Sequence, residues 1–226
     1  MALKGSVIAF DLDGTLVDTA PDLIGALNSL LADEKLPALP VEAARNLVGR
    51  GARALLERGF AEAGRPLSEV ATPGLVDRFI DIYLGRIAHE SAPFEGMEAA
   101  LDALSAEGAR LAVATNKRTD LSLALLDALD LTRRFEVVLG ADQARAQKPD
   151  PHLLVLAIER AGGTPDRAVF VGDSMIDQAT ARAAGVPVVG VSFGYNDIPL
   201  RAIDFDALID RYADLPAAAR RLLGAR

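Results

Sequence analysis

The chain has 226 residues, of which half are hydrophobic, a quarter are charged and 5% are aromatic, and it contains no cysteine. This composition is typical of a globular core with room for a smaller inserted domain, and it excludes disulfides, thiolate metal sites and cysteine nucleophiles. The formal net charge of -8 argues against nucleic acid as a partner, because that role needs a basic face. An anionic substrate would need local help from a metal ion, a Lys or Arg side chain or a helix N-terminus.

Five short apolar runs predict strands that are buried on both faces. They are residues 6–10, 110–114, 136–139, 168–171 and 188–191. The runs are continuous rather than alternating, and amphipathic helical segments separate the later ones, which is typical of a parallel sheet with crossover helices. The sequence therefore predicts an α/β fold built on a doubly wound parallel sheet.

The chain begins its first predicted strand without the charged segment, apolar run and cleavage site of a secretory signal. Its apolar runs are shorter than the roughly 18 to 20 residues needed to span a bilayer. We therefore expect a cytoplasmic protein with no membrane partner. The sequence leaves the oligomeric state open, as a monomer or a homodimer.

A helical insertion separates the first two predicted strands, which lie roughly 95 residues apart where a simple crossover needs far fewer. Helices are predicted at residues 22–33, 41–48, 50–64 and 75–89. Thr19 and Asp22 have the spacing of a capping box at the start of the first helix. We infer an α/β core domain of residues 1–16 and 92–226 and a helical cap domain of residues 17–91.

The two connections between core and cap, residues 16–19 and 92–94, are predicted to lie near the ends of the strands. Such a pair can serve as a hinge that lets the cap close over a ligand and exclude water. The alternative is a rigid helical subdomain that only adds core.

Two carboxylates leave the end of the first predicted strand. Asp11 and Asp13 face the same way, because residues two apart in an extended segment share a side. Like charges in one small volume repel unless a cation is shared or one acid stays protonated. The pair suits a nucleophile beside an acid/base or a Mg2+ ligand pair, and an Asp-rich turn is the alternative. Gly14 permits a tight turn, after which Thr15 offers a hydroxyl and an N–H to an oxyanion.

Later strand ends also release polar groups, which are Thr115 and Asn116, then Asp142, then Asp173. Ligands of open α/β sheets bind at the carboxyl ends of the strands, so these groups are expected to converge on the first acid pair. Asp177 lies one helical turn beyond Asp173, and its alternative role is a first-turn acid favoured by the helix dipole. Crowded acids without His or Cys favour Mg2+.

A cation is supplied by Lys148, in a loop that also contains two prolines. The prolines stiffen the loop, so the ammonium can neutralise carboxylate repulsion and contact a phosphoryl oxygen. The alternative for a lone Lys is a solvated surface residue. The two histidines, His89 and His152, are isolated and have no predicted role.

Together these motifs resemble the ordered motifs of the haloacid dehalogenase superfamily. They are Asp11-x-Asp13-Gly14-Thr15, the strand-end Thr115, Lys148-Pro149 and the run from Gly172-Asp173 to Asp177. The resemblance spans nearly the whole chain and implies a core similar to the Rossmann fold. The insertion resembles the small helical C1-type cap of the phosphoglycolate-phosphatase-like branch. This implies a Mg2+-dependent phosphomonoester hydrolase acting on a small anionic phosphorylated metabolite, with 2-phosphoglycolate as the expected substrate.

The resemblance also implies a role for each motif residue. Asp11 would attack phosphorus and form an aspartyl phosphate, and Asp13 would protonate the leaving oxygen and then deprotonate the hydrolytic water. Mg2+ would bind Asp11, the backbone carbonyl of Asp13 and Asp173. Lys148 would orient the nucleophile and balance charge, while Asp177 would support the metal site or Lys148.

Substrate contacts are expected from the second motif and from the cap. Thr115 and Asn116, with nearby backbone N–H groups, would hold phosphoryl oxygens. In the cap, glycines flank Arg50 and allow close approach, and Arg50 or Arg53 could pair with a substrate carboxylate. The alternative is a helix–helix turn with two surface arginines. Relatives in this branch often carry Asn at the position of Arg50. The resemblance at this position therefore supports the type of reaction more than it supports the particular substrate.

Other interpretations of the motifs stay open. An acid at position 13 favours phosphatases and phosphomutases over relatives that attack carbon, because halide departure needs no proton donor. The alternatives are a phosphatase of another small phosphometabolite such as a sugar phosphate or pyrophosphate, a β-phosphoglucomutase-like phosphotransferase, and a non-enzymatic phospho-acceptor switch. The run Gly194-Tyr195-Asn196 resembles the same branch, although Tyr195 could simply anchor a loop.

Overall fold

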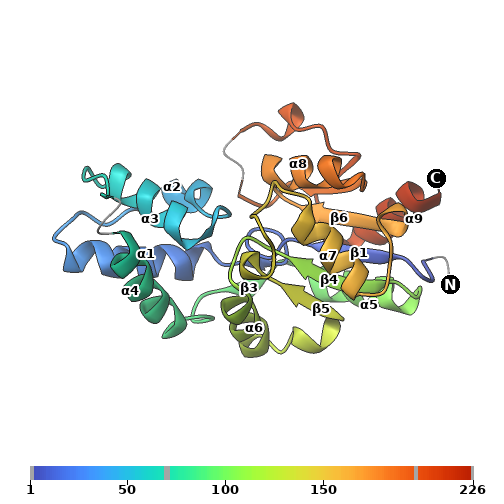
Figure 1. The fold of residues 1–226 in the computed structure, drawn as a ribbon, viewed down its shortest axis with the longest axis horizontal. Coiled ribbons are helices and arrows are strands. Elements are labelled where there is room, and N and C mark those ends of the chain that lie inside the picture. Colours follow the sequence, from blue (N-terminus) through green and yellow to red (C-terminus); the bar gives the residue numbers. More distant parts are fainter. Residues whose placement is uncertain (1–2, 69–71, 196–197, 225–226) are drawn as a thin grey trace.

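The computed structural model describes residues 3–68, 72–195 and 198–224. Its centre is a six-stranded parallel sheet with the order β5-β4-β1-β6-β7-β8 (Figure 1). The strands are β1 (Val7–Phe10), β4 (Arg110–Ala114), β5 (Val137–Leu139), β6 (Ala168–Gly172), β7 (Val188–Val191) and β8 (Ala207–Ile209). The predicted α/β fold with a doubly wound parallel sheet is confirmed.

The sequence did not predict β8. This three-residue strand lies at the edge of the sheet beside β7, and its Leu208 is 48% exposed. The strand has only three apolar residues, between Asp206 and Asp210, so its apolar run is too short to indicate a strand in the sequence.

β1 lies in the middle of the sheet, and its carboxyl end marks the place where the polar side chains that follow the strands meet. It pairs with β4 on one side and β6 on the other, with Ile8 level with Leu111 and Val169. The chain adds β5 beyond β4, then returns to add β6, β7 and β8 on the opposite side. The strand order therefore reverses at β1, and the carboxyl ends of β1, β4 and β6 meet where ligands bind in such sheets.

Helices cover both faces of the sheet. On one face, α5 (Met97–Ala106) and α9 (Leu215–Gly224) share an apolar cluster with Ile8 and Phe10 of β1. On the other face, α7 (His152–Arg160) and α8 (Met175–Ala184) share a cluster with Val7 and Ala9. Successive side chains of β1 thus enter opposite layers, as strand geometry requires. α6 (Thr119–Ala128) packs beside β5.

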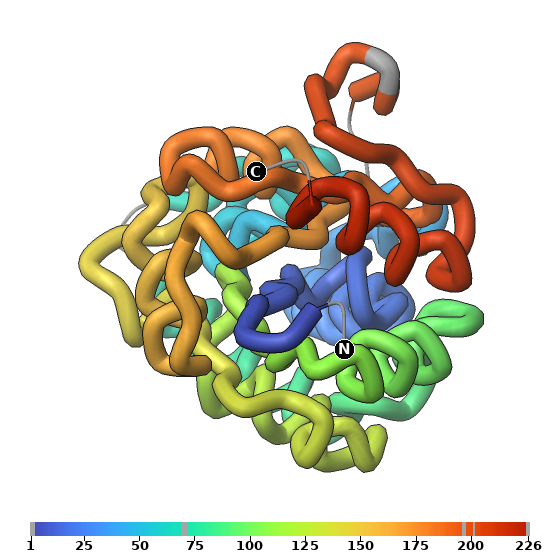
Figure 2. The backbone as a smooth tube through the Cα atoms, turned by 90° about the vertical axis from the view of Figure 1, so that its right-hand side faces the viewer, coloured from blue at the N-terminus to red at the C-terminus, as the bar shows by residue number. Residues whose placement is uncertain are grey.

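The insertion forms a separate helical layer at one end of the core (Figure 1). Its helices are α1 (Ala20–Asp33), α2 (Val41–Ala44), α3 (Gly51–Glu62) and α4 (Thr72–Leu84). They pack around their own apolar cluster, which includes Leu27, Phe60 and Phe79. The first and last described residues lie at the end of the core remote from this layer (Figure 2). The predicted domain boundaries, between residues 16 and 17 and between 91 and 92, stay a prediction.

Two predicted helices differ in detail from those observed. The helix expected at residues 41–48 is divided into α2 and a 3₁₀ turn, and the helix expected at residues 75–89 begins at Thr72 and ends at Leu84, before Gly85. The 3₁₀ turns are Arg45–Leu47, Thr132–Arg134, Ala141–Gln143, Pro165–Arg167, Leu200–Ala202 and Tyr212–Asp214. Within the described residues, no helix combines the length and the apolar character needed to cross a bilayer.

Two very short strands join the cap to the core. β2 (Val17–Asp18) and β3 (Ala92–Pro93) pair antiparallel where the chain passes into and out of the helical layer. They fall within the two segments for which we predicted a hinge. The two crossings are therefore adjacent, while the hinge motion itself stays a prediction.

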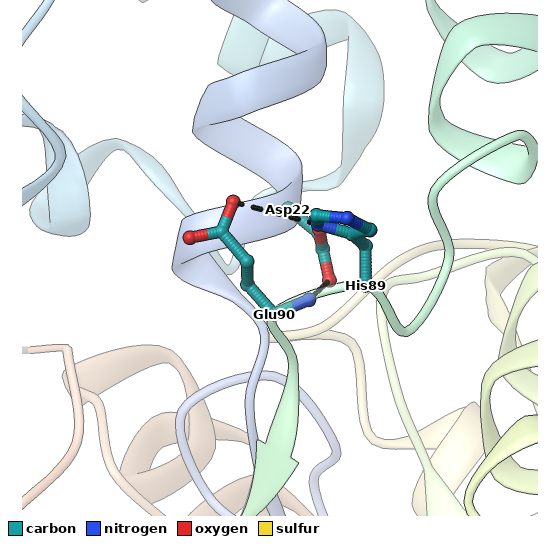
Figure 3. Close-up of side chains that lie close together, drawn as sticks. All are labelled: Asp22, His89 and Glu90. Carbon is teal, nitrogen blue, oxygen red and sulfur yellow. Dashed lines mark hydrogen bonds and ion pairs between the residues drawn. The ribbon is translucent and has the colours of Figure 1, made fainter.

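Asp22 at the start of α1 holds the second crossing in place (Figure 3). Its fully buried carboxylate accepts N–H bonds from Glu90 at 2.9 Å and Ser91 at 2.7 Å, and it also accepts from the Ser91 hydroxyl and the Arg86 guanidinium. Burial alone would raise the pKa of Asp22, but these donors hold it below its usual value. Asp22 thus acts as a clamp between α1 and the end of the cap.

Thr19 and Asp22 do not form the predicted capping box. Thr19 precedes α1, but its hydroxyl donates to Asp13 at 2.8 Å rather than capping the helix. The prediction is wrong because both side chains have tertiary partners that replace the local cap. His89, beside Glu90 in Figure 3, is 75% exposed and lies 3.9 Å from the Glu90 carboxylate, in keeping with a surface position.

We expect Asp22→Ala to lower the free energy of unfolding by about 3 kcal/mol, because buried N–H groups and a guanidinium lose their acceptor. Urea denaturation at pH 7 measures this, and Asp81→Ala, at an exposed position of α4, is the matched control. The difference should shrink below about pH 4, since a carboxylate with a depressed pKa contributes stability only while ionised. Equal stability of wild type and Asp22→Ala would contradict the clamp.

Candidate active site

The first strand ends at a buried carboxylate. Asp11 directly follows β1, and its N–H donates to the Val171 carbonyl at 2.9 Å, so sheet bonding fixes its backbone. Its side chain is buried, with Oδ1 2.8 Å from Lys148 Nζ. Burial raises the pKa of Asp11 to about 6, although Lys148 opposes the rise, because a charge is less stable away from water.

The turn after this strand requires glycine. Gly14 has a φ of 81°, and a Cβ there would lie 2.6 Å from the Asp173 carboxylate and 2.7 Å from the Tyr195 ring. Glycine therefore permits both the backbone conformation and the close approach. The Thr15 hydroxyl donates to Asp173 at 3.1 Å, so it holds a carboxylate where we expected a contact to an oxyanion.

Asp13 is paired with a lysine that the sequence analysis did not identify. Lys117 Nζ lies 2.9 and 3.1 Å from the two Asp13 carboxylate oxygens and 4.6 Å from the centre of the Tyr83 ring. Burial alone would lower the pKa of Lys117, but Asp13 and Tyr83 raise it above its usual value. In the sequence it is an isolated Lys in a loop, and its one signal is that it directly follows Thr115 and Asn116.

The end of β6 supplies the second acid pair. Asp173 is buried, and burial followed by repulsion from Asp177 and Asp11 raises the pKa of Asp173 well above its usual value. Asp177 completes a capping box at the start of α8 and is fully buried. Its other carboxylate oxygen lies 2.7 Å from Lys148 Nζ. Asp177 therefore both starts the helix and holds the lysine.

Lys148 bridges the two acid pairs. Its Nζ lies 2.8 Å from Asp11 and 2.7 Å from Asp177, and although burial alone would lower its pKa, these carboxylates raise it above its usual value. Asn116 fixes the loop, because its Oδ1 accepts the Lys148 N–H at 2.8 Å and its Nδ2 donates to the Lys148 carbonyl at 3.3 Å and to Gly49 of the cap at 3.4 Å. Asn116 thus positions Lys148, and its phosphate contact stays a prediction.

The remaining strand-end groups are Thr115 and Asp142, and they have different partners. Thr115 is buried at the end of β4, and its hydroxyl oxygen accepts the Lys117 N–H at 3.2 Å. Asp142 instead accepts from the N–H and the hydroxyl of Thr119 at 2.6 and 2.9 Å, where α6 begins. Asp142 thus borders the same cavity between cap and core as Asp13, but its carboxylate is engaged by the unsatisfied N–H groups of a helix start.

The cap forms one side of the site. A cavity of about 340 Å³ between cap and core is bordered by Asp13 and Lys117 from the core and by two glycines of the cap. Arg53 also borders this cavity, but its side chain is 61% exposed and pairs with Glu57 at 2.8 Å. Arg50 borders a separate hollow near the second acid pair. A substrate contact by either arginine stays a prediction.

Tyr195 connects the acids with the crossings between cap and core. Its N–H donates to Asp173 at 2.6 Å, and its hydroxyl donates to Asp18 of β2 at 2.6 Å and accepts the first N–H of α1 at 2.9 Å. Arg45 of the cap binds the same Asp18 oxygen at 2.7 Å. Tyr195 therefore anchors its loop, whereas Asn196 lies outside the described residues.

The donor set fits a divalent cation that prefers oxygen ligands. The residues with carboxylate oxygens within 4.8 Å of one another are Asp11, Asp173 and Asp177. Together with Asp13 they place four buried carboxyl groups beside two buried lysines. Both carboxylate oxygens of Asp177 are engaged, one by Lys148 and the other by Ser174, and the assignment of Asp11 and Asp173 as the side chains that would hold Mg2+ stays a prediction.

Comparison with known proteins agrees with this geometry. Residues 8–191 match the haloacid dehalogenase-like hydrolases. A phosphoglycolate phosphatase of Caulobacter vibrioides is 57% identical over 98% of this chain and 93% of its own length, and one of Escherichia coli K12 is 38% identical over 84% and 82%. The crystal structure of a predicted phosphoglycolate phosphatase from Haemophilus somnus superposes with a TM-score of 0.87 at 33% identity, covering 96% of this chain and 98% of that one.

The chain therefore belongs to the haloacid dehalogenase-like hydrolases. Within that family it is a phosphoric monoester hydrolase of the phosphoglycolate-phosphatase-like branch, which confirms the family, the fold and the enzyme class predicted from the ordered motifs.

Proposed function

We propose that the chain hydrolyses 2-phosphoglycolate with the help of Mg2+, through an aspartyl phosphate on Asp11. One observation carries this proposal. Beside the carboxyl ends of neighbouring strands of one parallel sheet, the structure brings together four side chains, those of Asp11, Asp13, Asp173 and Lys148. The names of the relatives from Caulobacter and Escherichia coli support the substrate. The cytoplasmic location stays a prediction.

In the first step, a carboxylate oxygen of Asp11 attacks phosphorus while the bond to the ester oxygen breaks. Asp13 donates a proton to the departing oxygen, so the product leaves as an alcohol. Lys148, 2.8 Å from Asp11, orients the nucleophile and offsets negative charge. Mg2+ held by Asp11, the Asp13 carbonyl and Asp173 would supply positive charge to the phosphoryl oxygens.

In the second step, Asp13 takes a proton from a water molecule as the water oxygen attacks phosphorus. The bond between Asp11 and phosphorus breaks, which releases inorganic phosphate and restores the carboxylate. Thr115 and nearby N–H groups contact the phosphoryl oxygens, and Asp177 keeps Lys148 in position. The cap, residues 17–91, closes over the site and limits the access of other water.

Multiple-turnover phosphate release across a panel of phosphorylated metabolites tests this proposal. We expect 2-phosphoglycolate to have a higher kcat/KM than sugar phosphates and pyrophosphate, and we expect EDTA to remove activity that Mg2+ restores. If 2-phosphoglycolate is not among the better substrates, its assignment fails while the reaction class stands. Release that stops near one equivalent would favour a phospho-acceptor switch, and conversion of a sugar phosphate to its isomer would favour a phosphotransferase.

A further inference from the structure

The proposed mechanism leaves one buried cation without a role. Within the part of the chain that the structure describes, the buried lysines are Lys117 and Lys148. Lys148 lies between two carboxylates, those of Asp11 and Asp177. In the described residues, the carboxylate paired with Lys117 is that of Asp13, whose two oxygens lie 2.9 and 3.1 Å from Lys117 Nζ. An ammonium has three N–H donors, and the Asp13 carboxylate meets them from one side. Lys117 can therefore bind a second anion without leaving the site.

The cap adds a second polar group at this point. Tyr83 of α4 is fully buried, its ring centre lies 4.6 Å from Lys117 Nζ, and its hydroxyl has no hydrogen-bond partner within the described residues. A buried hydroxyl without a partner is unfavourable unless a ligand satisfies it. Lys117 and Tyr83 are both among the residues that border the cavity of about 340 Å³ between cap and core.

The other walls of this cavity strengthen an ionic contact. Most of them are apolar, with Leu55 and Phe79 from the cap and Leu121 from the core among the side chains. Apolar surroundings lower the effective dielectric constant, so an ammonium attracts an anion more strongly there than in water. The cavity therefore favours a small anion placed beside Lys117.

We propose that Lys117 and Tyr83 bind a carboxylate on the leaving group, and thereby select phosphate esters that carry a negative charge close to the ester oxygen. The inference rests on the proposed function, in which Asp13 protonates that oxygen. In 2-phosphoglycolate the carboxylate carbon is two bonds from the ester oxygen, which brings the carboxylate within reach of an ammonium that contacts Asp13. Arg53, by contrast, is paired with Glu57 on the exposed side of the cavity.

The test compares two substrates with the same skeleton. 2-Phosphoglycolate carries a carboxylate where 2-hydroxyethyl phosphate carries a neutral hydroxymethyl group. We expect Lys117→Met to lower the ratio of their kcat/KM values by about 100-fold, and Tyr83→Phe to lower it by about fivefold. Lys4→Met, which removes an exposed lysine that precedes β1, is the matched control and should leave the ratio unchanged. Circular dichroism shows whether each variant is folded.

A binding measurement separates this inference from the proposed function. 3-Phosphonopropionate is a nonhydrolysable analogue of 2-phosphoglycolate, and 3-hydroxypropylphosphonate is its neutral counterpart. Calorimetry on the full chain with Mg2+ should give tighter binding of the carboxylate analogue to wild type, and Lys117→Met should remove this preference. If wild type keeps that pattern but does not turn over 2-phosphoglycolate, the proposed substrate fails and the anion subsite stands.

Two results would overturn the subsite. One is an equal loss of kcat/KM for both esters in Lys117→Met, which would make Lys117 only a positioning residue for Asp13. The other is equal binding of the two phosphonates to wild type. If Lys117→Met does not fold, Tyr83→Phe decides the question, since removing one hydroxyl leaves the packing of the ring in place. An unchanged substrate ratio in that variant then contradicts the proposal.

Discussion

Asp11→Asn should reduce phosphatase activity by about 10⁴-fold or more while the chain stays folded. An amide has no anionic oxygen to attack phosphorus, and it also weakens the ligand set of the cation. Phosphate release from 2-phosphoglycolate and p-nitrophenyl phosphate measures the loss. Asp81→Asn, at an exposed position, is the control and should keep full activity. Substantial activity in Asp11→Asn would refute the aspartyl-phosphate mechanism.

The same variant should be more stable than wild type in metal-free buffer above pH 6. Burial raises the pKa of Asp11 to about 6, so the folded chain holds this proton more tightly than the unfolded chain. The stability that Asp11 contributes is therefore full at low pH and is lost as the pH rises through 6. We expect urea denaturation at pH 8 to give Asp11→Asn an advantage of about 1 to 3 kcal/mol, which disappears below pH 4. A variant less stable than wild type at pH 8 would contradict this account.

Lys148→Met should remove activity and lower the free energy of unfolding by about 3 to 5 kcal/mol at pH 7. The substitution leaves the Asp11 and Asp177 carboxylates buried without the ammonium that lies within 2.8 Å of each. The loss should become smaller as the pH falls toward 5, because Asp11, whose pKa burial raises to about 6, then binds a proton and no longer carries an uncompensated charge. Urea denaturation from pH 5 to pH 8 measures it, with Lys4→Met as the control.

A second substitution separates charge from packing in this prediction. Lys148→Met combined with Asp177→Asn should recover part of the lost stability, since one unpaired charge is gone, but no activity. If Lys148→Met alone is within about 1 kcal/mol of wild type at pH 7, the lysine does not neutralise the acids in the way that their separation implies.

The sequence predicts the acids of the site well because their positions follow from local rules. Asp11 and Asp13 share a side of an extended segment, and Asp173 follows another buried strand of the same sheet. Parallel strands place their carboxyl ends at one edge, so identifying the strands was enough to bring these carboxylates together. Lys148 could be inferred because crowded acids require a cation.

The remaining contacts could not be predicted because they depend on partners distant in the sequence. Lys117 meets Asp13 and the cap residue Tyr83 only after the helical layer has packed against the core. Asp22 has the spacing of a local cap, yet the folded chain gives it donors from the other end of the insertion. Asp142 follows a strand end as expected, but the start of α6 engages its carboxylate. In each case a tertiary contact outweighs a local pattern.

The position of the cap within the chain has a consequence for how quickly the sheet can assemble. β1 and β4 are neighbours, yet the whole helical layer lies between them in sequence. Pairing them in an unfolded chain closes a loop of about a hundred residues, and each halving of an open loop lowers the entropic cost by about 0.6 kcal/mol. Once the cap helices pack around Leu27 and Phe60, pairing of β2 with β3 leaves less than half of that loop open. Early folding of the cap therefore speeds the long-range pairing on which the core depends.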